Sequence, residues 1–336
     1  MTHPTTNPQE IAAGIVGLGL MGCSITTCLL MAGHPVIAVA PLPADLIHAE
    51  ERIKHHLQKS LEENLTDKTP DYFFERLQIT EDYNSLKPCQ LVIECTLEDL
   101  EIKKQVYQKI EDVIAATAVL VSNTSAIPIT ILQSHTKFPA RFLGLHWAEP
   151  SHTTRFLEII CGDQSELHFG EWLYNLSHCW GKEPTLVRKD IRGFITNRLM
   201  YAMYREACSL VEKGYATVED VDRACRNNAG YWMTLAGVFR WMDLTGVPAY
   251  HAVMKELLPT LSNQTEVPKL IDDIVKNGGR GVLNGKGFYT YTEEEARLWE
   301  ETFTEFSYDI RELALKYPAD VVQRKIDSKG NGKREE

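Results

Sequence analysis

The feature that most constrains this chain is a glycine-rich run that comes directly after an apolar, β-branched segment. Residues 11–16 read as a buried strand, and Gly17-Leu18-Gly19-Leu20-Met21-Gly22 follows at once. In a strand–turn–helix unit the first glycine permits the tight turn, the second lets a pyrophosphate approach the backbone, and the third lets helix and strand pack closely. The start of the next helix then offers amide donors to the phosphates. Glycines in an apolar turn can serve packing alone, but their place between a strand and a helix favours a dinucleotide-binding site.

The residues themselves leave the choice of dinucleotide open. A site for NAD usually places Asp or Glu at the end of the second strand, where it binds the ribose hydroxyls. Here the second strand is expected at residues 36–39, and Ala40 stands in the acidic place. A site for NADP would place an arginine nearby, and none follows before Arg52. We therefore expect NAD, with NADP as the alternative.

The order of the expected elements divides the chain into two domains. Short β-branched runs alternate with amphipathic stretches up to about residue 190, which predicts a mainly parallel sheet covered on both faces, and the later pattern is helical. The expected strands are 11–16, 36–39, 91–95, 119–122, 142–146 and 156–161. The expected helices are 45–65, 97–114, 195–212, 217–226, 232–242, 250–261, 267–276 and 293–315. We predict a flexible N-terminus (1–10), an α/β Rossmann-like domain (11–190), an all-α domain (191–325) and a polar, frayed tail (326–336).

Composition argues against several other classes of protein. The chain carries 35 Lys and Arg against 46 Asp and Glu, a net charge of −11, which disfavours a broad nucleic-acid-binding face. The eight cysteines contain no C-x-x-C pair, so we expect no metal site and no disulfide framework, and instead a reducing, cytoplasmic compartment. Residues 11–33 are apolar enough to span a membrane, but their glycines and the lack of Lys or Arg before them favour a buried strand, turn and helix.

Five motifs, taken in order, resemble the L-3-hydroxyacyl-CoA dehydrogenase family and its relatives, among them lambda-crystallin (an L-gulonate 3-dehydrogenase) and carnitine dehydrogenase. The motifs are Gly17-x-Gly-x-Met-Gly22, Ile93-Glu-Cys-Thr-Leu-Glu98 with Lys103, Ser122-Asn-Thr-Ser125, Gly144-Leu-His146 and Gly193-Phe-Ile-Thr-Asn-Arg198. The resemblance covers roughly residues 11–290. It implies NAD-dependent oxidation of a 3-hydroxyl to a 3-ketone, a small-molecule substrate, a role in fatty-acid metabolism and a homodimer formed through the helical domain.

His146 is the candidate catalytic base. Oxidation of a secondary alcohol needs a base for the hydroxyl proton, and histidine suits neutral pH. His146 ends an expected buried strand and Glu158 lies inside the next one, so the two can become neighbours. A carboxylate within the apolar run 156–160 is costly to bury without a partner. Pairing would relieve that cost and stabilise the imidazolium formed in the reaction, as the family's dyad does, whereas an ordinary salt bridge is the alternative.

The resemblance implies further roles. Ser125, at the end of an expected strand, would hydrogen-bond the reacting oxygen near the nicotinamide, and Asn197 would bind the substrate carbonyl from the second domain. The active site would then lie between the two domains. Glu98 and Lys103 would sit beside the cofactor, as residues 17–22 do. Each has an ordinary alternative, which is a turn cap for Ser125, a solvated helix position for Asn197 and a common charge pair for Glu98 and Lys103.

Several departures from the family's pattern concern ligand recognition. Glu149 stands where the family has an amide near the cofactor, and Arg192 replaces a proline. The positions that contribute serine and lysine to CoA in the acyl-CoA enzymes carry His56 and Glu63 here, although the nearby Lys54 and Lys59 could substitute for them. These departures predict retained chemistry on an altered substrate.

Three functions are compatible with the sequence. The first is NAD-dependent oxidation of an L-3-hydroxyacyl-CoA, which the overall resemblance and the run Gly285-Lys-Gly-Phe-Tyr289 favour. The second is dehydrogenation of a free 3-hydroxy acid, such as a sugar acid or a carnitine-like compound, which Ala40 and the two acidic departures favour. The third is a non-catalytic, crystallin-like binding protein, and the retention of all four candidate catalytic residues speaks against it.

Overall fold

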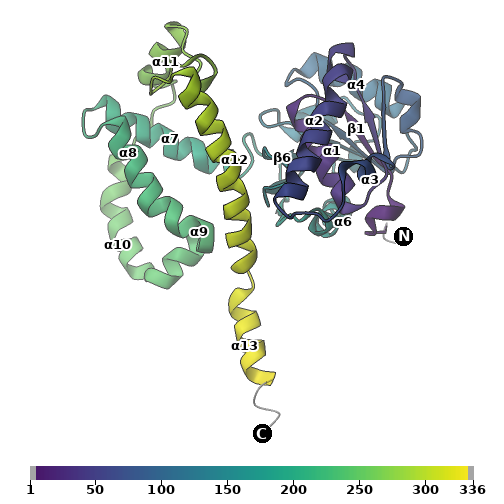
Figure 1. Ribbon diagram of the computed structural model, residues 1–336. Coiled ribbons are helices and arrows are strands. Elements are labelled where there is room, and N and C mark those ends of the chain that lie inside the picture. The colour runs from purple at the N-terminus through teal and green to yellow at the C-terminus, as the bar shows by residue number, and fades with distance from the viewer. Residues whose placement is uncertain (1–4, 332–336) are drawn as a thin grey trace. The chain divides into compact units, whose positions relative to one another are not determined.

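The computed structural model describes residues 5–331 and divides into two compact units, of which the first ends at Asn197 and the second begins at Arg198 (Figure 1). The division falls later than the expected boundary at residue 190. The turn before α7 (Thr196–Glu212) belongs to the first unit because Phe194 is buried in its core. The backbone amides of Ile195 and Thr196 also donate hydrogen bonds to Glu158 of that unit.

The first unit contains an eight-stranded sheet in the order β3-β2-β1-β4-β5-β6-β7-β8. Neighbouring strands run parallel except β6 and β7, which are antiparallel. The strands are β1 (Ala13–Val16), β2 (Val36–Val39), β3 (Leu77–Thr80), β4 (Leu91–Glu94), β5 (Val119–Ser122), β6 (Phe142–Trp147), β7 (Leu157–Cys161) and β8 (Thr185–Val187). The expected Rossmann-like α/β fold is confirmed, and the six expected strands are all present.

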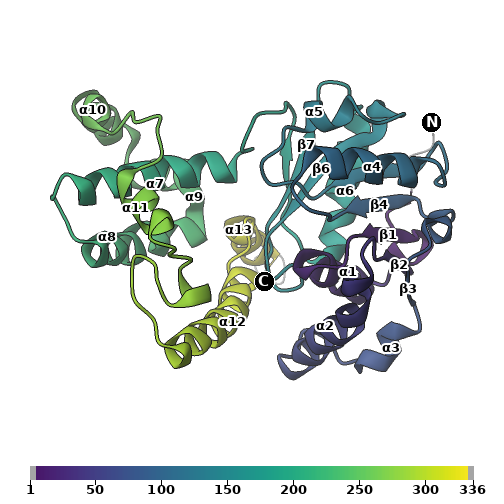
Figure 2. The same cartoon turned by 90° about the horizontal axis from the view of Figure 1, so that it is seen from above.

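Helices cover both faces of this sheet, and Figure 2 shows α1 and α2 on one side with α4 and α5 on the other. Every residue of β1, β4, β5 and β6 is buried, as expected for strands covered on two sides. Because β1, β4 and β5 run parallel, their carboxyl ends meet at one edge of the sheet. The helices are α1 (Leu20–Ala32), α2 (Pro43–Glu62), α3 (Pro70–Phe74), α4 (Leu100–Glu111), α5 (Ile129–Gln133) and α6 (Leu167–Ser177), with 3-10 turns at Pro8–Glu10, Tyr83–Leu86, Pro139–Arg141 and His178–Trp180.

The two edge strands are absent from the sequence prediction. β3 has no buried residue, and β8 is three residues long with a single buried side chain. An edge strand needs fewer apolar residues than a central one, so its periodic signal is weak.

Both ends of the chain are more ordered than expected. Residues 5–10 are held against the first unit, since Trp172 Nε1 donates to the Thr5 carbonyl oxygen at 2.9 Å and a 3-10 turn forms at Pro8–Glu10. At the other end α13 (Val321–Asn331) is helical through residues 326–331, which were expected to be a frayed tail. The remaining positions of these two predictions, 1–4 and 332–336, lie outside the described residues.

The second unit is helical, as expected. A π-helical turn (Cys225–Ala229) joins α8 to α9. Of the described residues from Arg198 onward, only Cys208, Ser209 and Tyr308 are buried. No helix in the described part of the chain is both long and apolar enough to cross a membrane, and all eight cysteines are unbridged. After α7 the helices are α8 (Val218–Ala224), α9 (Gly230–Thr245), α10 (Val247–Leu257), α11 (Lys269–Lys276), α12 (Glu293–Lys316) and α13, with 3-10 turns at Leu258–Thr260 and Val282–Asn284.

Candidate active site

The glycine loop has the geometry that a bound pyrophosphate requires. Gly17 has φ +101°, and a Cβ there would meet the Cys95 carbonyl oxygen at 2.7 Å. A Cβ on Gly22 would meet the Gly17 carbonyl oxygen at 1.8 Å, so α1 packs too closely on the turn for any side chain. A Cβ on Gly19 would meet nothing within 4 Å, so open space lies beside the middle glycine. The three positions therefore fit a tight turn, a close helix packing and a backbone that phosphate can approach.

The end of β2 carries no carboxylate. Ala40 follows the strand as expected, and its buried backbone amide donates to the Thr80 carbonyl oxygen at 2.9 Å. The structure thus confirms where the second strand ends. It leaves the ribose without the acidic partner that this position commonly supplies.

His146 and Glu158 face each other across the antiparallel strands β6 and β7. The strand register pairs the two residues directly, and His146 Nδ1 lies 3.0 Å from Glu158 Oε2. The neighbour relation expected from the sequence is confirmed. Because Glu158 accepts the proton on Nδ1, Nε2 is the nitrogen left to accept one from another group. Nε2 lies 3.1 Å from the Ser125 hydroxyl oxygen.

The start of α7 holds the second oxygen of Glu158. Glu158 Oε1 accepts hydrogen bonds from the backbone amides of Ile195 at 3.1 Å and Thr196 at 2.9 Å. Burial alone would raise the pKa of Glu158, but the hydrogen bonds from His146 and from these amides outweigh it, and the pKa lies below its ordinary value. Glu158 is therefore charged at neutral pH and fixes the tautomer and orientation of His146.

Asn197 joins the same group of residues. Its Nδ2 donates to the Ser125 carbonyl oxygen at 3.0 Å. Asn197 is the last residue of the first compact unit, so its contact with Ser125 lies within that unit. The chain enters α7 before it leaves the first unit, and this is why a residue on that helix reaches Ser125.

Two phenylalanines that the sequence analysis did not single out pack against His146. The ring centres of Phe156 and Phe194 lie 5.4 Å and 5.5 Å from that of the imidazole. Phe194 has φ +50° and follows Gly193 at φ +80°. A positive φ costs a residue other than glycine about 1 kcal/mol or more, and this backbone conformation places the Phe194 ring against His146. The signal for Phe194 was its place in the Gly193-Phe194 motif, whereas Phe156 looks like any apolar strand residue.

Glu98 fixes the loop that carries Ser125. Glu98 Oε1 accepts from the backbone amides of Ser125 at 3.0 Å and Ala126 at 2.8 Å, and from the Thr124 hydroxyl at 2.5 Å. Burial alone would raise the pKa of Glu98, but Thr124, the Ala126 amide and Lys103 lower it overall. Glu98 therefore holds the backbone of the loop at Ser125, and it also lies near the carboxyl end of β4.

Glu94 is a buried charge that the sequence analysis missed. Lys103 Nζ lies 2.9 Å from both carboxylate oxygens of Glu94, and both side chains are at most 1% exposed. Tyr107 and Ser122 donate their hydroxyl groups to the same carboxylate at 3.1 Å and 2.6 Å. Lys103 also lies 3.5 Å from Glu98, so it links the sheet to the Ser125 loop from a buried position. The signal was an acidic residue that ends the apolar run 91–94.

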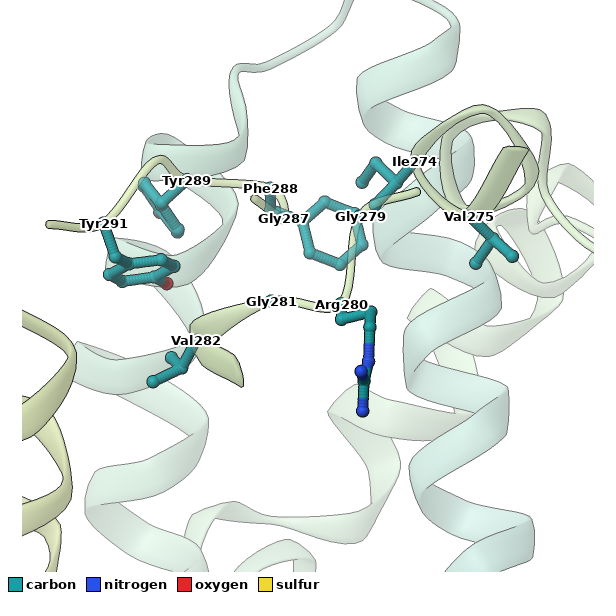
Figure 3. Close-up of a pocket in the computed structure, with 10 residues that line it drawn as sticks. All are labelled: Ile274, Val275, Gly279, Arg280, Gly281, Val282, Gly287, Phe288, Tyr289 and Tyr291. Atoms are coloured by element: carbon teal, nitrogen blue, oxygen red, sulfur yellow. The ribbon is translucent and has the colours of Figure 1, made fainter. Parts of the chain in front are cut away.

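A separate pocket lies in the second unit, around the Gly285–Tyr289 run. It has a volume of about 450 Å³ and is lined mainly by apolar and glycine residues of the segments 274–282 and 287–291. Figure 3 shows the Arg280 side chain extending away from the Phe288 ring. The lining contains no acid, histidine or serine, so the chemistry described above belongs to the first unit.

Two family models match the chain. The 3-hydroxyacyl-CoA dehydrogenase NAD binding domain matches residues 12–191, and the C-terminal domain of the same family matches residues 193–291. The chain belongs to the 3-hydroxyacyl-CoA dehydrogenase family. As a member of this family it is an NAD-dependent oxidoreductase that acts on CH–OH groups. The open glycine loop is consistent with NAD as its cofactor.

Relatives of this family member act on more than one class of substrate. It is 31% identical to the 5-formyl-3-hydroxy-2-methylpyridine 4-carboxylate 5-dehydrogenase of Mesorhizobium japonicum, over 84% of this chain and 91% of that one. It is 32% identical to the 3-hydroxybutyryl-CoA dehydrogenase of Mycobacterium tuberculosis, over 83% and 97%. A crystal structure of the pyridine carboxylate enzyme, described as an NAD+ dependent dismutase, matches with a TM-score of 0.83 and 29% identity over 90% and 97%.

Proposed function

We propose that this family member oxidises the CH–OH group of a free, carboxylate-bearing small molecule, with His146 as the general base. A substrate hydroxyl beside Ser125 can give its proton to His146 Nε2 while the serine hydroxyl donates to the same oxygen. NAD, when bound, accepts the hydride. Glu158 stays charged and stabilises the imidazolium, and Asn197 orients a polar group of the substrate next to the Ser125 carbonyl.

The side chains on α2 favour a free acid over a CoA thioester as the substrate. His56 is half-buried, and its ring stacks on that of His152 with centres 4.9 Å apart. Burial, followed by His55 and Arg52, lowers the pKa of His56 to about 4, so the ring is uncharged at neutral pH. Glu63 at the end of α2 is an exposed acid. The two positions that the resemblance assigns to CoA therefore supply no positive charge to its phosphates.

Two further observations support a free acid. Arg192 Nη1 lies 3.4 Å from the Ala126 carbonyl oxygen, which places a guanidinium beside the residue that follows Ser125. A guanidinium suits recognition of a carboxylate. The similarity to a pyridine carboxylate dehydrogenase points the same way. A hydrated aldehyde presents the same H–C–O–H group as an alcohol, so an aldehyde substrate would need no other residues.

The second candidate is oxidation of an L-3-hydroxyacyl-CoA. The family models and the 32% identity to a 3-hydroxybutyryl-CoA dehydrogenase favour it. Both candidates use the same four residues and differ in how the remainder of the substrate is held.

Binding of free coenzyme A separates the two candidates without a known substrate. We expect saturating CoA to leave the melting temperature unchanged, whereas NAD raises it, since a ligand at a hundred times its Kd adds about 2.7 kcal/mol of stability. The variant Glu63→Lys should gain measurable CoA affinity because it restores a cation at the end of α2. Strong stabilisation of the wild-type protein by CoA would contradict the free-acid proposal.

We also propose that the second unit pairs with a second copy of the chain, in the cytoplasm. α9 has no buried residue, and its Phe239 is 81% exposed, so this helix leaves apolar side chains open to a partner. A helical unit with so few buried residues gains little stability by itself, and a matching unit can cover its apolar surface. A monomeric mass in light scattering would contradict the dimer.

The eight unbridged cysteines support a reducing compartment.

A further inference from the structure

A cluster of polar side chains lies behind the glycine loop, apart from the four residues of the proposed mechanism. The loop after β6, residues 148–154, carries Glu149, Ser151 and His152, and these residues contact α1 and α2. Ser151 and His152 are buried, as is Ser24 on α1. The cluster therefore joins the segment after the catalytic histidine to the helix that begins at the glycine loop.

The Ser24 hydroxyl is the centre of this cluster. The Ser151 backbone amide donates to Ser24 Oγ at 2.7 Å, and His152 Nδ1 lies 3.3 Å from the same oxygen. Glu149 also hydrogen-bonds to Ser24 and to the Ser151 amide. Ser24 lies in the second turn of α1, so the Glu149 carboxyl is close to the helix whose first amides would face the cofactor phosphates.

The other oxygen of Glu149 is poorly satisfied. Glu149 Oε2 is buried and has no hydrogen-bond partner among the described residues. The charge of Lys182 acts on Glu149, but the Lys182 ammonium group donates its hydrogen bonds to the carbonyl oxygens of Ser151 and Thr154. A buried carboxylate without a full set of donors favours its neutral form. Burial raises the pKa of Glu149 to about 7, against the lowering by Ser24, Lys182 and the Ser151 amide.

We propose that Glu149 is a neutral carboxylic acid when the cofactor is bound, and that its ionisation weakens NAD binding, so that NAD and a proton bind together. The pyrophosphate of NAD is negative, and at the start of α1 the helix dipole would attract it. An ionised Glu149 against the second turn of the same helix opposes that attraction. The neutral acid adds no charge there. The proposal concerns cofactor affinity alone and needs no assumption about the substrate.

The other ionisable groups around Glu149 come from both helices, its own loop and the segment after α6. They are Cys23 on α1, Arg52 and His56 on α2, His152, and Lys182. Burial raises the pKa of the Cys23 thiol to about 11, while burial lowers that of His56 to about 4. Neither of these two groups changes charge between about pH 6 and 8. His152 touches Ser24 directly, so the test must separate His152 from Glu149.

The sign of the effect follows from the raised pKa. Glu149 is neutral below about pH 7 and ionises as the pH rises through that value. NADH affinity is therefore highest at the acid end and falls toward the alkaline end. We expect the Kd for NADH to rise about fivefold between about pH 6 and 8 as this charge appears.

The experiment measures the Kd for NADH by fluorescence titration across this pH range in the full-length protein. Wild type should show the rise, and Glu149→Gln should lose it, because its amide stays neutral. The matched control Glu81→Gln, at an exposed acid, should keep the wild-type curve. An unchanged pH dependence in Glu149→Gln would overturn the proposal and assign the titration to another group, such as His152. A wild-type Kd that is independent of pH would overturn it as well.

A second variant keeps the proposal testable if Glu149→Gln does not fold. Ser24→Ala removes the hydroxyl that lowers the pKa of Glu149. The midpoint of the Kd curve should then move to higher pH. A shift to lower pH, or no shift, would contradict the coupling between Ser24 and Glu149.

Discussion

His146→Gln is expected to lower kcat by about a thousandfold, which is within the range that general acid–base catalysis contributes. The glutamine side chain cannot accept the hydroxyl proton at neutral pH, although it can still hydrogen-bond Glu158 and Ser125. The Kd for NADH should stay near the wild-type value, because the substitution leaves the glycine loop (residues 17–22) unchanged. Steady-state kinetics measure kcat, and titration with NADH measures the Kd.

The control for this variant is His135→Gln, at an exposed histidine of the same unit. We expect it to have wild-type turnover. Near-normal kcat in His146→Gln would remove His146 from the role of base. Loss of NADH binding in that variant would instead show that the imidazole holds the cofactor site together.

Glu158→Gln should lower kcat by a comparable factor, about a thousandfold, for a different reason. The amide of glutamine can donate to His146 Nδ1, which stabilises the tautomer with the proton on Nε2, and this tautomer cannot take a proton from the substrate. The amide also removes the negative charge that stabilises the imidazolium. Glu158→Asp, which keeps the charge on a shorter side chain, should retain more activity than Glu158→Gln.

The charge of Glu158 can be tested by comparing its two variants. The hydrogen bonds from His146 and from the start of α7 hold the pKa of Glu158 below its ordinary value, so the wild-type carboxylate is ionised at neutral pH. Its contribution to stability is lost only as the pH falls through that lowered pKa. Equal activity of Glu158→Gln and Glu158→Asp would mean that the charge does not matter and that Glu158 serves only to hold α7.

The parts of the site that could be predicted are those with a local pattern. The glycine spacing defines the turn after β1. An acidic residue within an apolar strand, Glu158, follows a strand that ends in a histidine, His146, and this pattern predicts that the two side chains pair across the sheet. The pairing of His146 with Glu158 followed because adjacent antiparallel strands place one direct partner opposite each residue.

The parts that could not be predicted depend on contacts between distant segments. Lys103 was expected beside the cofactor, and only the packing of α4 against β4 shows that it is buried on Glu94. The Glu149 cluster depends on a loop, α1 and α2 meeting at Ser24. The hydrogen bond from Asn197 to Ser125 joins residues 72 positions apart, and it depends on how the start of α7 packs on the first unit.

The most direct test of the substrate class is oxidation of NADH by the purified protein, with acetoacetyl-CoA compared against acetoacetate, dehydrocarnitine and a 3-keto sugar acid. We expect turnover with a free acid at a kcat/KM at least about a hundredfold above that for the thioester, since specificity is a difference of affinities. Rapid turnover of acetoacetyl-CoA, with no activity toward any of the free acids, would contradict it and assign the protein to acyl-CoA oxidation.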